Sequence, residues 1–184
     1  MGKRKFAAAL LSSIIIAGQA YALTDITAAH REDNAAANAE EIIDMRSRLA
    51  KTIEPGSEVT EETFRKVCGA VAKRVKEISE SEGVKIRHAS LKNRNAMNAA
   101  TPDEAALIKL FEDEKKNERW DTVTLDGIAY KRYTRPIFVE KACLACHGDK
   151  DARPRFIVEK YPDDKAYGYR TGELRGIISI LLPE

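Results

Sequence analysis

Five consecutive residues carry the strongest chemical signal in this sequence. Cys143-Leu144-Ala145-Cys146-His147 has the C-x-x-C-H spacing that is typical of covalent c-type haem attachment. Two thiols at this spacing can bond to one edge of a planar macrocycle, and the adjacent imidazole can then bind its iron. The motif therefore predicts one haem c, held by thioethers at Cys143 and Cys146, with His147 as an axial ligand.

Other uses of paired cysteines fit the sequence less well. A catalytic C-x-x-C dithiol is typical of a thioredoxin-like βαβ unit, and no such unit is predicted around Cys143. A structural zinc site needs a second ligand pair, and the sequence has no other Cys-x-x-Cys and no His-x-x-x-His. A redox dithiol is therefore the main alternative to haem.

The third cysteine, Cys68, has no disulfide partner once the motif cysteines are used. One interpretation is a small hydrophobic residue on the buried face of a helix. The other is the second axial ligand of the iron, for which His88, His30, Met45 and Met97 are the remaining candidates. His88 shares a predicted strand face with apolar residues, whereas Met97 lies in a polar loop and Met45 fits a core position.

The first residues resemble a secretory signal peptide. Lys3, Arg4 and Lys5 precede an apolar run of residues 6–17, and Ala20-Tyr21-Ala22 offers the small residues of a cleavage site. The run is too short to span a bilayer. We expect residues 1–22 to be removed and the remaining chain to be exported, to a bacterial periplasm and without a membrane span.

The rest of the chain alternates predicted helices and strands. The alanine-rich residues 24–52 lack Gly and Pro and predict a long helix, so that the expected organisation is an N-terminal helix (23–56) followed by one domain (57–184). Thr60 and Gly83 bound a second helix, and Thr101-Pro102-Asp103-Glu104 starts a third with a capping box. Strands are predicted at residues 84–89, 120–125, 128–139 and 174–182, with a hairpin turn at Asp126-Gly127 and the last strand in the interior of the sheet. This order predicts an α+β fold.

Length and charge exclude several classes of protein. A chain of 184 residues with 33% charged residues is the size of one ordinary domain and is not disordered by composition. A net charge of +2 provides no large basic field, so we expect no nucleic-acid partner.

The sequence around the haem motif is similar to that of a known family. The matching residues are Ser90, Arg94-Asn95, Asn98, Pro102-Asp103-Glu104, Tyr133, Pro136-Ile137, Cys143-Leu144-Ala145-Cys146-His147-Gly148 and Gly172-Glu173-Leu174-Arg175-Gly176-Ile177-Ile178-Ser179. On these residues the chain resembles the PAS-like periplasmic c-type haem proteins, which occur as soluble mono-haem proteins and as sensor domains of membrane receptors. The family usually has proline where this chain has Ala96, and Gly-Asp where it has Gly172-Glu173.

The resemblance implies a PAS-like antiparallel sheet flanked by helices, with covalent haem at one side. It also implies His147 as one axial ligand and a helix cysteine, matched here by Cys68, as the other. Thiolate ligation opposite imidazole stabilises ferric iron and lowers the reduction potential.

Two functions are compatible with such a site. The first is a haem-based redox or gas sensor that exchanges an axial ligand and signals to a partner protein. The second is a periplasmic single-electron carrier with a fixed ligand set. An enzyme is not expected, because a peroxidase needs an open iron position and an acid–base residue, for which only His88 is available.

Secondary roles are expected for several polar residues and for the first helix. Arg87, Lys92 and Arg94 are candidates to pair with haem propionates, although solvated surface positions are the commoner use of such residues. Asn95 and Asn98 are expected to organise their own loop by local hydrogen bonds. The alanine-rich helix is a candidate contact between two chains of a homodimer.

Overall fold

The computed structural model describes residues 6–54 and 56–184 and the side chains of residues 27–54 and 56–184. The predicted cationic start of the signal peptide, Lys3 to Lys5, and Pro55 lie outside the described residues. The helices are α1 (Phe6–Ala50), α2 (Glu61–Phe64), the π-helical turn η1 (Arg65–Gly69), α3 (Ala70–Glu82), the 3₁₀ turn η2 (Ala96–Asn98), α4 (Pro102–Glu114), the 3₁₀ turn η3 (Lys141–Cys143), α5 (Leu144–His147) and α6 (Arg155–Lys160). The strands are β1 (Lys85–Ala89), β2 (Arg119–Leu125), β3 (Ile128–Phe138) and β4 (Leu174–Pro183).

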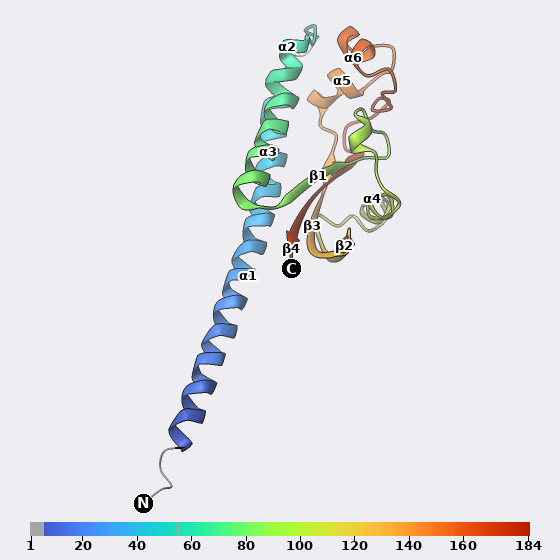
Figure 1. The fold of residues 1–184 in the computed structure, drawn as a ribbon. Coiled ribbons are helices and arrows are strands. Elements are labelled where there is room, and N and C mark those ends of the chain that lie inside the picture. The colour runs from blue at the N-terminus through green and yellow to red at the C-terminus, as the bar shows by residue number, and fades with distance from the viewer. Residues whose placement is uncertain (1–5, 55) are drawn as a thin grey trace, which may run out of the picture.

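The long first helix begins earlier than the sequence predicted. It starts at Phe6 rather than near Thr24, because the residues between them contain no proline that would stop it. Small buried residues, Ala35 and Ala39, let its second half pack closely on the sheet and on α3. The first half runs away from the rest of the protein (Figure 1). Within the described residues, none of the helices combines the length and hydropathy needed to cross a membrane.

The second predicted helix forms between the expected boundaries but contains an unexpected turn. The Thr60 hydroxyl caps its start by accepting from the Thr63 N–H at 3.2 Å, and Gly83 ends it with a φ of +64°. Between α2 and α3 the backbone widens into η1, in which the Ala70 N–H reaches the Arg65 carbonyl five residues back. Such π-turns occur often at functional sites.

The four strands form one antiparallel sheet in the order β1-β4-β3-β2. As predicted, the apolar β4 is an interior strand, and the Asp126-Gly127 turn that joins β2 to β3 has positive φ angles of 53° and 78°. Successive residues of β4 face opposite sides, so that Ile178 and Ile180 contact α1 and α3 whereas Ile177 contacts α4. Helices on both faces explain why nearly every residue of this strand is apolar.

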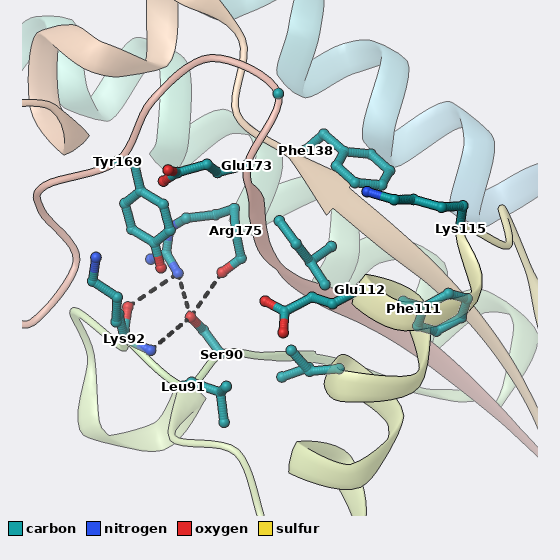
Figure 2. A pocket seen from close by; sticks show the side chains of 13 residues that line it. Ser90, Leu91, Lys92, Phe111, Glu112, Lys115, Phe138, Tyr169, Glu173 and Arg175 are labelled. Atoms are coloured by element: carbon teal, nitrogen blue, oxygen red, sulfur yellow. Dashed lines mark hydrogen bonds between the residues drawn. The ribbon is translucent and has the colours of Figure 1, made fainter.

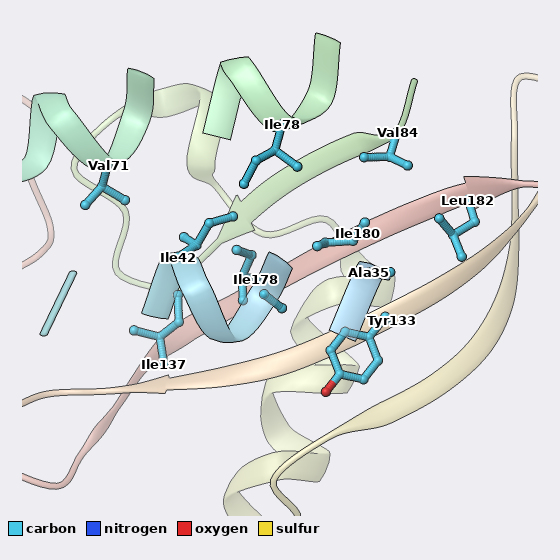
Figure 3. Close-up of a cluster of buried hydrophobic side chains, with 11 residues drawn as sticks. Ala35, Ile42, Val71, Ile78, Val84, Tyr133, Ile137, Ile178, Ile180 and Leu182 are labelled. Carbon is cyan, nitrogen blue, oxygen red and sulfur yellow. The ribbon is translucent and has the colours of Figure 1, made fainter. Parts of the chain in front are cut away.

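The main core lies between the sheet and the helix pair α1 and α3 (Figure 3). Its buried members are Ala35, Ala39, Ile42, Val71, Ile78, Val84, Tyr133, Ile137, Ile178, Ile180 and Leu182. On the opposite face α4 begins with the predicted capping box, in which Thr101 and Glu104 bond reciprocally. This core fixes the positions of the strand ends and of the π-turn that together line the site described below.

Gly176 is required where β4 approaches β1. A Cβ there would lie 2.2 Å from the Ala89 carbonyl oxygen, and the backbone φ is +154°. We expect Gly176→Ala to lower the free energy of unfolding by roughly 3 kcal/mol, because it adds a clash to backbone strain. Urea denaturation measures this loss. Gly172→Ala is the control: its φ is +87° but its Cβ would meet nothing within 4 Å, so a cost of about 1 kcal/mol is expected. Equal costs for the two variants would contradict the close approach.

Candidate functional site

A cavity of about 300 Å³ lies where the end of β1 and the start of β4 meet η1. Its wall contains three residues with iron-binding side chains, Cys68, His88 and His147, and three arginines, Arg46, Arg94 and Arg175. These six residues come from α1, η1, β1, the segment after β1, α5 and β4, and so only the folded chain brings them together.

His147 is held in an orientation suited to metal binding. Its Nδ1 lies 2.7 Å from the Ala166 carbonyl oxygen, which can only accept, so Nδ1 carries the proton and donates. This leaves the lone pair on Nε2. Burial, together with the positive charges of Arg175 and Arg94, keeps the pKa of His147 well below its usual range. A neutral imidazole anchored through its other nitrogen is the usual form of a histidine ligand.

The two motif cysteines precede His147 on consecutive short helical turns. Cys143 ends η3 and is half-buried, whereas Cys146 lies in α5 and is buried. Burial raises the pKa of the Cys146 thiol to about 11. A reactive dithiol is expected to have a lowered pKa and to follow a strand of a βαβ unit, and the sheet here is wholly antiparallel. The geometry therefore gives the redox-dithiol interpretation no support.

Cys68 is not packed in the core, contrary to the interpretation that places it on the buried helix face. It lies in η1 and is exposed, while its neighbours Val67 and Val71 are buried. The π-turn inserts one residue into the helix and so turns Cys68 away from the apolar stripe and into the cavity wall. Although solvent reaches the sulfur, the surrounding protein raises the pKa of the Cys68 thiol by desolvation, and the positive charges of Arg46 and Arg94 oppose this rise.

Among the other candidate ligands, only His88 lines the cavity. Its Nε2 lies 3.1 Å from Nη2 of Arg46, which donates, so that Nε2 accepts. Met97 is 78% exposed and does not line the cavity. Met45 packs against the main core, and His30 is exposed on α1 near Asn34. The structure thus brings Cys68 and His88 together with His147, and leaves the other three outside.

His88 predicts a measurable dependence of stability on pH. Burial, reinforced by Arg46 and Arg175, lowers the pKa of His88 to about 3. An unfolded histidine takes up a proton below about pH 6.5, so protonation favours the unfolded state between these two values. The free energy of unfolding should therefore fall as pH decreases through this window, by up to about 1.4 kcal/mol per pH unit from this residue.

Urea denaturation of His88→Gln over the acidic range checks this expectation, since the variant should lose that part of the slope. His30→Gln is the control, because His30 is exposed. A slope unchanged by His88→Gln would show that the folded protein protonates this imidazole normally.

The basic residues expected near the site have different environments. Arg94 is almost fully buried, lies 3.3 Å from Asp164 and donates to the Cys146 carbonyl oxygen at 2.6 Å. It therefore fixes the segment after β1 to the motif. Arg87 is paired with Glu104 at 2.6 Å, and Lys92 lies over the Tyr169 ring at 4.2 Å. Neither of the last two lines the cavity that contains His147.

Asn95 stabilises its loop through its side chain, whereas Asn98 does so through its backbone. Asn95 accepts from the Met97 N–H at 3.0 Å, which is the local loop bond expected from the sequence. Asn98 contributes to the same loop through its backbone, and both residues line the cavity.

Two arginines of the cavity wall, Arg46 and Arg175, were not predicted from the sequence as site residues. Arg46 lies on α1 among Ile42, Ile43 and Leu49, so an isolated cation within an apolar helix stripe was the available signal. Arg175 is the second residue of the apolar strand β4 and precedes a run of aliphatic residues. The short helix α6 was also missed; its Phe156 contacts Phe64 with ring centroids 5.6 Å apart and closes this end of the fold.

A second cavity of about 450 Å³ lies beside α4, between Leu91 and the segment that leads into β4 (Figure 2). Arg175 also borders it, where the guanidinium donates to the Ser90 hydroxyl at 2.5 Å and to the Lys92 carbonyl at 3.1 Å. No histidine or cysteine is among its described lining residues, so it offers no soft metal ligand. Across the described part of the chain, no cluster of three or more His, Cys, Asp or Glu side chains could hold a metal ion by itself.

Comparisons with known proteins agree with this geometry. A family model described as Tll0287-like (Tll0287) matches residues 25–183. The chain belongs to the Tll0287-like family. The crystal structure of the cyanobacterial heme-protein Tll0287 is similar to it with 37% sequence identity and a TM-score of 0.75, over 84% of this chain and 96% of that chain. No curated protein matches the sequence.

The family match confirms the resemblance drawn from the sequence. The PAS-like α+β fold, with an antiparallel sheet flanked by helices, is likewise confirmed. The solved structure is that of a haem protein, and the match to the family model includes the segment that contains the C-x-x-C-H motif.

Proposed function

We propose that this chain is an exported haem protein that carries one haem c. The observation that carries the proposal is the set of side chains around one cavity: His147 with a free Nε2, anchored through Nδ1, and Cys68 in the wall of the same cavity. The similarity to a cyanobacterial haem protein supports it. Bound haem would supply a one-electron redox centre that can also take a small gas at a free iron position.

The donor set fits this group. Cys143 and Cys146 would hold it through two thioethers, and His147 would bind the iron through Nε2. Cys68 is proposed as the second axial ligand, and His88 is the alternative inside the same cavity. The guanidinium of Arg46 in the cavity wall has no carboxylate partner among the described residues and a buried Nε without a hydrogen bond, which suits a group that brings negative charge.

We propose that the protein acts as a redox or gas sensor through exchange of the Cys68 ligand. Cys68 lies in a π-turn and is reached by solvent, while the core positions on either side of it, Val67 and Val71, stay packed. The sulfur could therefore leave the iron without opening the core. His147 is fixed by Ala166 and would keep the second bond.

A single-electron carrier is the second candidate, and a different observation favours it. Cys68 and His147 line one cavity together, so both axial positions can be filled by protein side chains. A low-potential carrier needs such a fixed pair. A filled coordination sphere leaves no place for substrate chemistry, and for this reason an enzyme is not part of the proposal.

The remaining parts of the proposal concern the setting in the cell. Removal of residues 1–22 would release the chain into the periplasm, where c-type haem is attached. Its partner would be a redox or signalling protein rather than a nucleic acid, since the net charge is +2 for the full chain and −1 once Lys3, Arg4 and Lys5 are removed with residues 1–22. A contact between two copies through α1 stays a prediction, and a monomeric mass in light scattering would exclude it.

Absorption spectra test the proposal and separate the two functions. Protein made in a strain that matures c-type haem is measured oxidised, then reduced with dithionite, then with CO. A thiolate signature that weakens on reduction, followed by rapid CO binding, supports the sensor. A six-coordinate spectrum that persists and excludes CO supports the carrier. Protein with no covalently retained haem would refute both.

A further inference from the structure

Arg46 is a half-buried arginine that has no carboxylate partner among the described residues. It projects from α1 into the wall of the cavity that also contains Cys68 and His147. Its Nη2 donates to His88 Nε2 at 3.1 Å, and its Nε is buried without any hydrogen-bond partner. Among the residues that the structure describes, no carboxylate forms a hydrogen bond or an ion pair with it. Burying an unpaired charge is costly, so an anion is expected here when the site is complete.

Three other arginines with little or partial exposure, Arg94, Arg132 and Arg175, are better supplied with partners. Arg94 is paired with Asp164, and Arg132 is paired with Asp121 and Asp103. Arg175 has no carboxylate, but it donates to a hydroxyl and to a backbone carbonyl. Among the described residues, Arg46 has the neutral imidazole of His88 as its one side-chain hydrogen-bond partner, which does not compensate its charge.

The nearest sources of negative charge are thiols rather than carboxylates. Cys68 lines the same cavity as Arg46, and burial lowers the pKa of Arg46 whereas interaction with the thiols of Cys68 and Cys143 raises it. In the proposed function Cys143 becomes a neutral thioether. Cys68 then remains as the sulfur that can carry negative charge beside this guanidinium.

We propose that Arg46 is a positioning residue whose guanidinium compensates the negative charge of the Cys68 sulfur and thereby sets how firmly that sulfur stays on the iron. This inference rests on the proposed function. When one electron enters the site from an external reductant, the net charge becomes more negative by one. A fixed cation stabilises that state with the sulfur still bound. Without it, departure of the sulfur relieves the excess charge.

The test compares Arg46→Gln, Arg46→Lys and Arg48→Gln in the haem-loaded protein. Arg48 is the control because it is an exposed arginine two residues away on the same helix and does not line the cavity. After reduction with dithionite, Arg46→Gln should retain less of the thiolate signature and bind CO roughly tenfold faster or more, as expected for loss of a charged interaction. It should also have a lower reduction potential. Arg46→Lys and Arg48→Gln should stay close to the wild type.

Arg46→Lys separates the effect of the charge from the effect of losing the arginine side chain, because it replaces that side chain and keeps the positive charge. Thermal unfolding followed by circular dichroism reports whether each variant folds. If Arg46→Gln and Arg46→Lys change the CO rate equally, the shape of the side chain matters rather than its charge, and the inference is wrong.

A double-mutant cycle identifies the anion that Arg46 compensates. The reduction potential is measured for Arg46→Gln in the wild-type and in the Cys68→Ser background. A shift that disappears in Cys68→Ser supports action through the sulfur. A shift that persists shows that Arg46 compensates a different anion, such as a haem carboxylate, and overturns the inference while the proposed function stands. Absence of haem from every protein would instead refute the proposed function.

Discussion

Replacing both Cys143 and Cys146 by alanine should abolish all covalently retained haem. Thioether bonds need both sulfurs, and no other pair of cysteines with this spacing exists in the chain. The change should be complete rather than partial, because Cys68 lies on a different element and has no second thiol beside it at the required spacing. Haem staining of a denaturing gel, together with extraction into acidified solvent, measures the loss.

Cys68→Ala is the matched control for this experiment, since it removes the third thiol and leaves the motif intact. Its haem should remain in the denatured band. Haem that still migrates with the double variant would show that attachment does not use the motif. The same gel would reveal a redox-dithiol protein, because the wild type would then carry no haem.

The second large effect is expected from Cys68→Ser. Serine keeps the size of the side chain but is a poor iron ligand, so the oxidised protein should lose its low-spin thiolate spectrum. The reduction potential should rise, because a strong electron donor to ferric iron has been removed. Absorption spectroscopy and a potentiometric titration measure both changes. Stability should change by less than about 1 kcal/mol, as is usual for exposed positions.

His88→Gln provides the comparison. His88 lines the same cavity, but its Nε2 accepts from Arg46 and is not free in the arrangement described here. If Cys68 is the ligand, His88→Gln keeps the thiolate spectrum. If instead Cys68→Ser leaves the oxidised spectrum unchanged while His88→Gln alters it, His88 is the ligand and the ligand-exchange proposal falls with Cys68.

The sequence already determined most of the secondary structure. Local signals fixed the capped start of α4 at Thr101, the tight turn at Asp126-Gly127 and the end of the second helix at Gly83, because each depends on residues that are adjacent along the chain. The apolar run in β4 correctly indicated an interior strand. The boundary of α1 was less well predicted, since no breaker residue separates the leader-like run from the alanine-rich part.

The motif itself also needs no tertiary information. The spacing of Cys143, Cys146 and His147 indicates haem attachment wherever the segment lies, since all three residues are within five consecutive positions. For the second ligand, the sequence supplied five candidates from different elements. Periodicity could place Cys68 only on an apolar helix face, where a cysteine is usually inert.

The tertiary structure decided what surrounds the motif. The π-turn η1, which depends on hydrogen bonds five residues apart and leaves no clear mark in the sequence, turns Cys68 from the core into the cavity. The cavity also brings together His88, Arg46 and Arg175, which come from elements that are far apart in the sequence, namely β1, α1 and β4. Their nearness follows from how α1 and β1 pack against β4, which is a long-range outcome of burying the apolar core. The predicted attachment motif is therefore a local property of the sequence, whereas the side chains and charges around it are determined by packing.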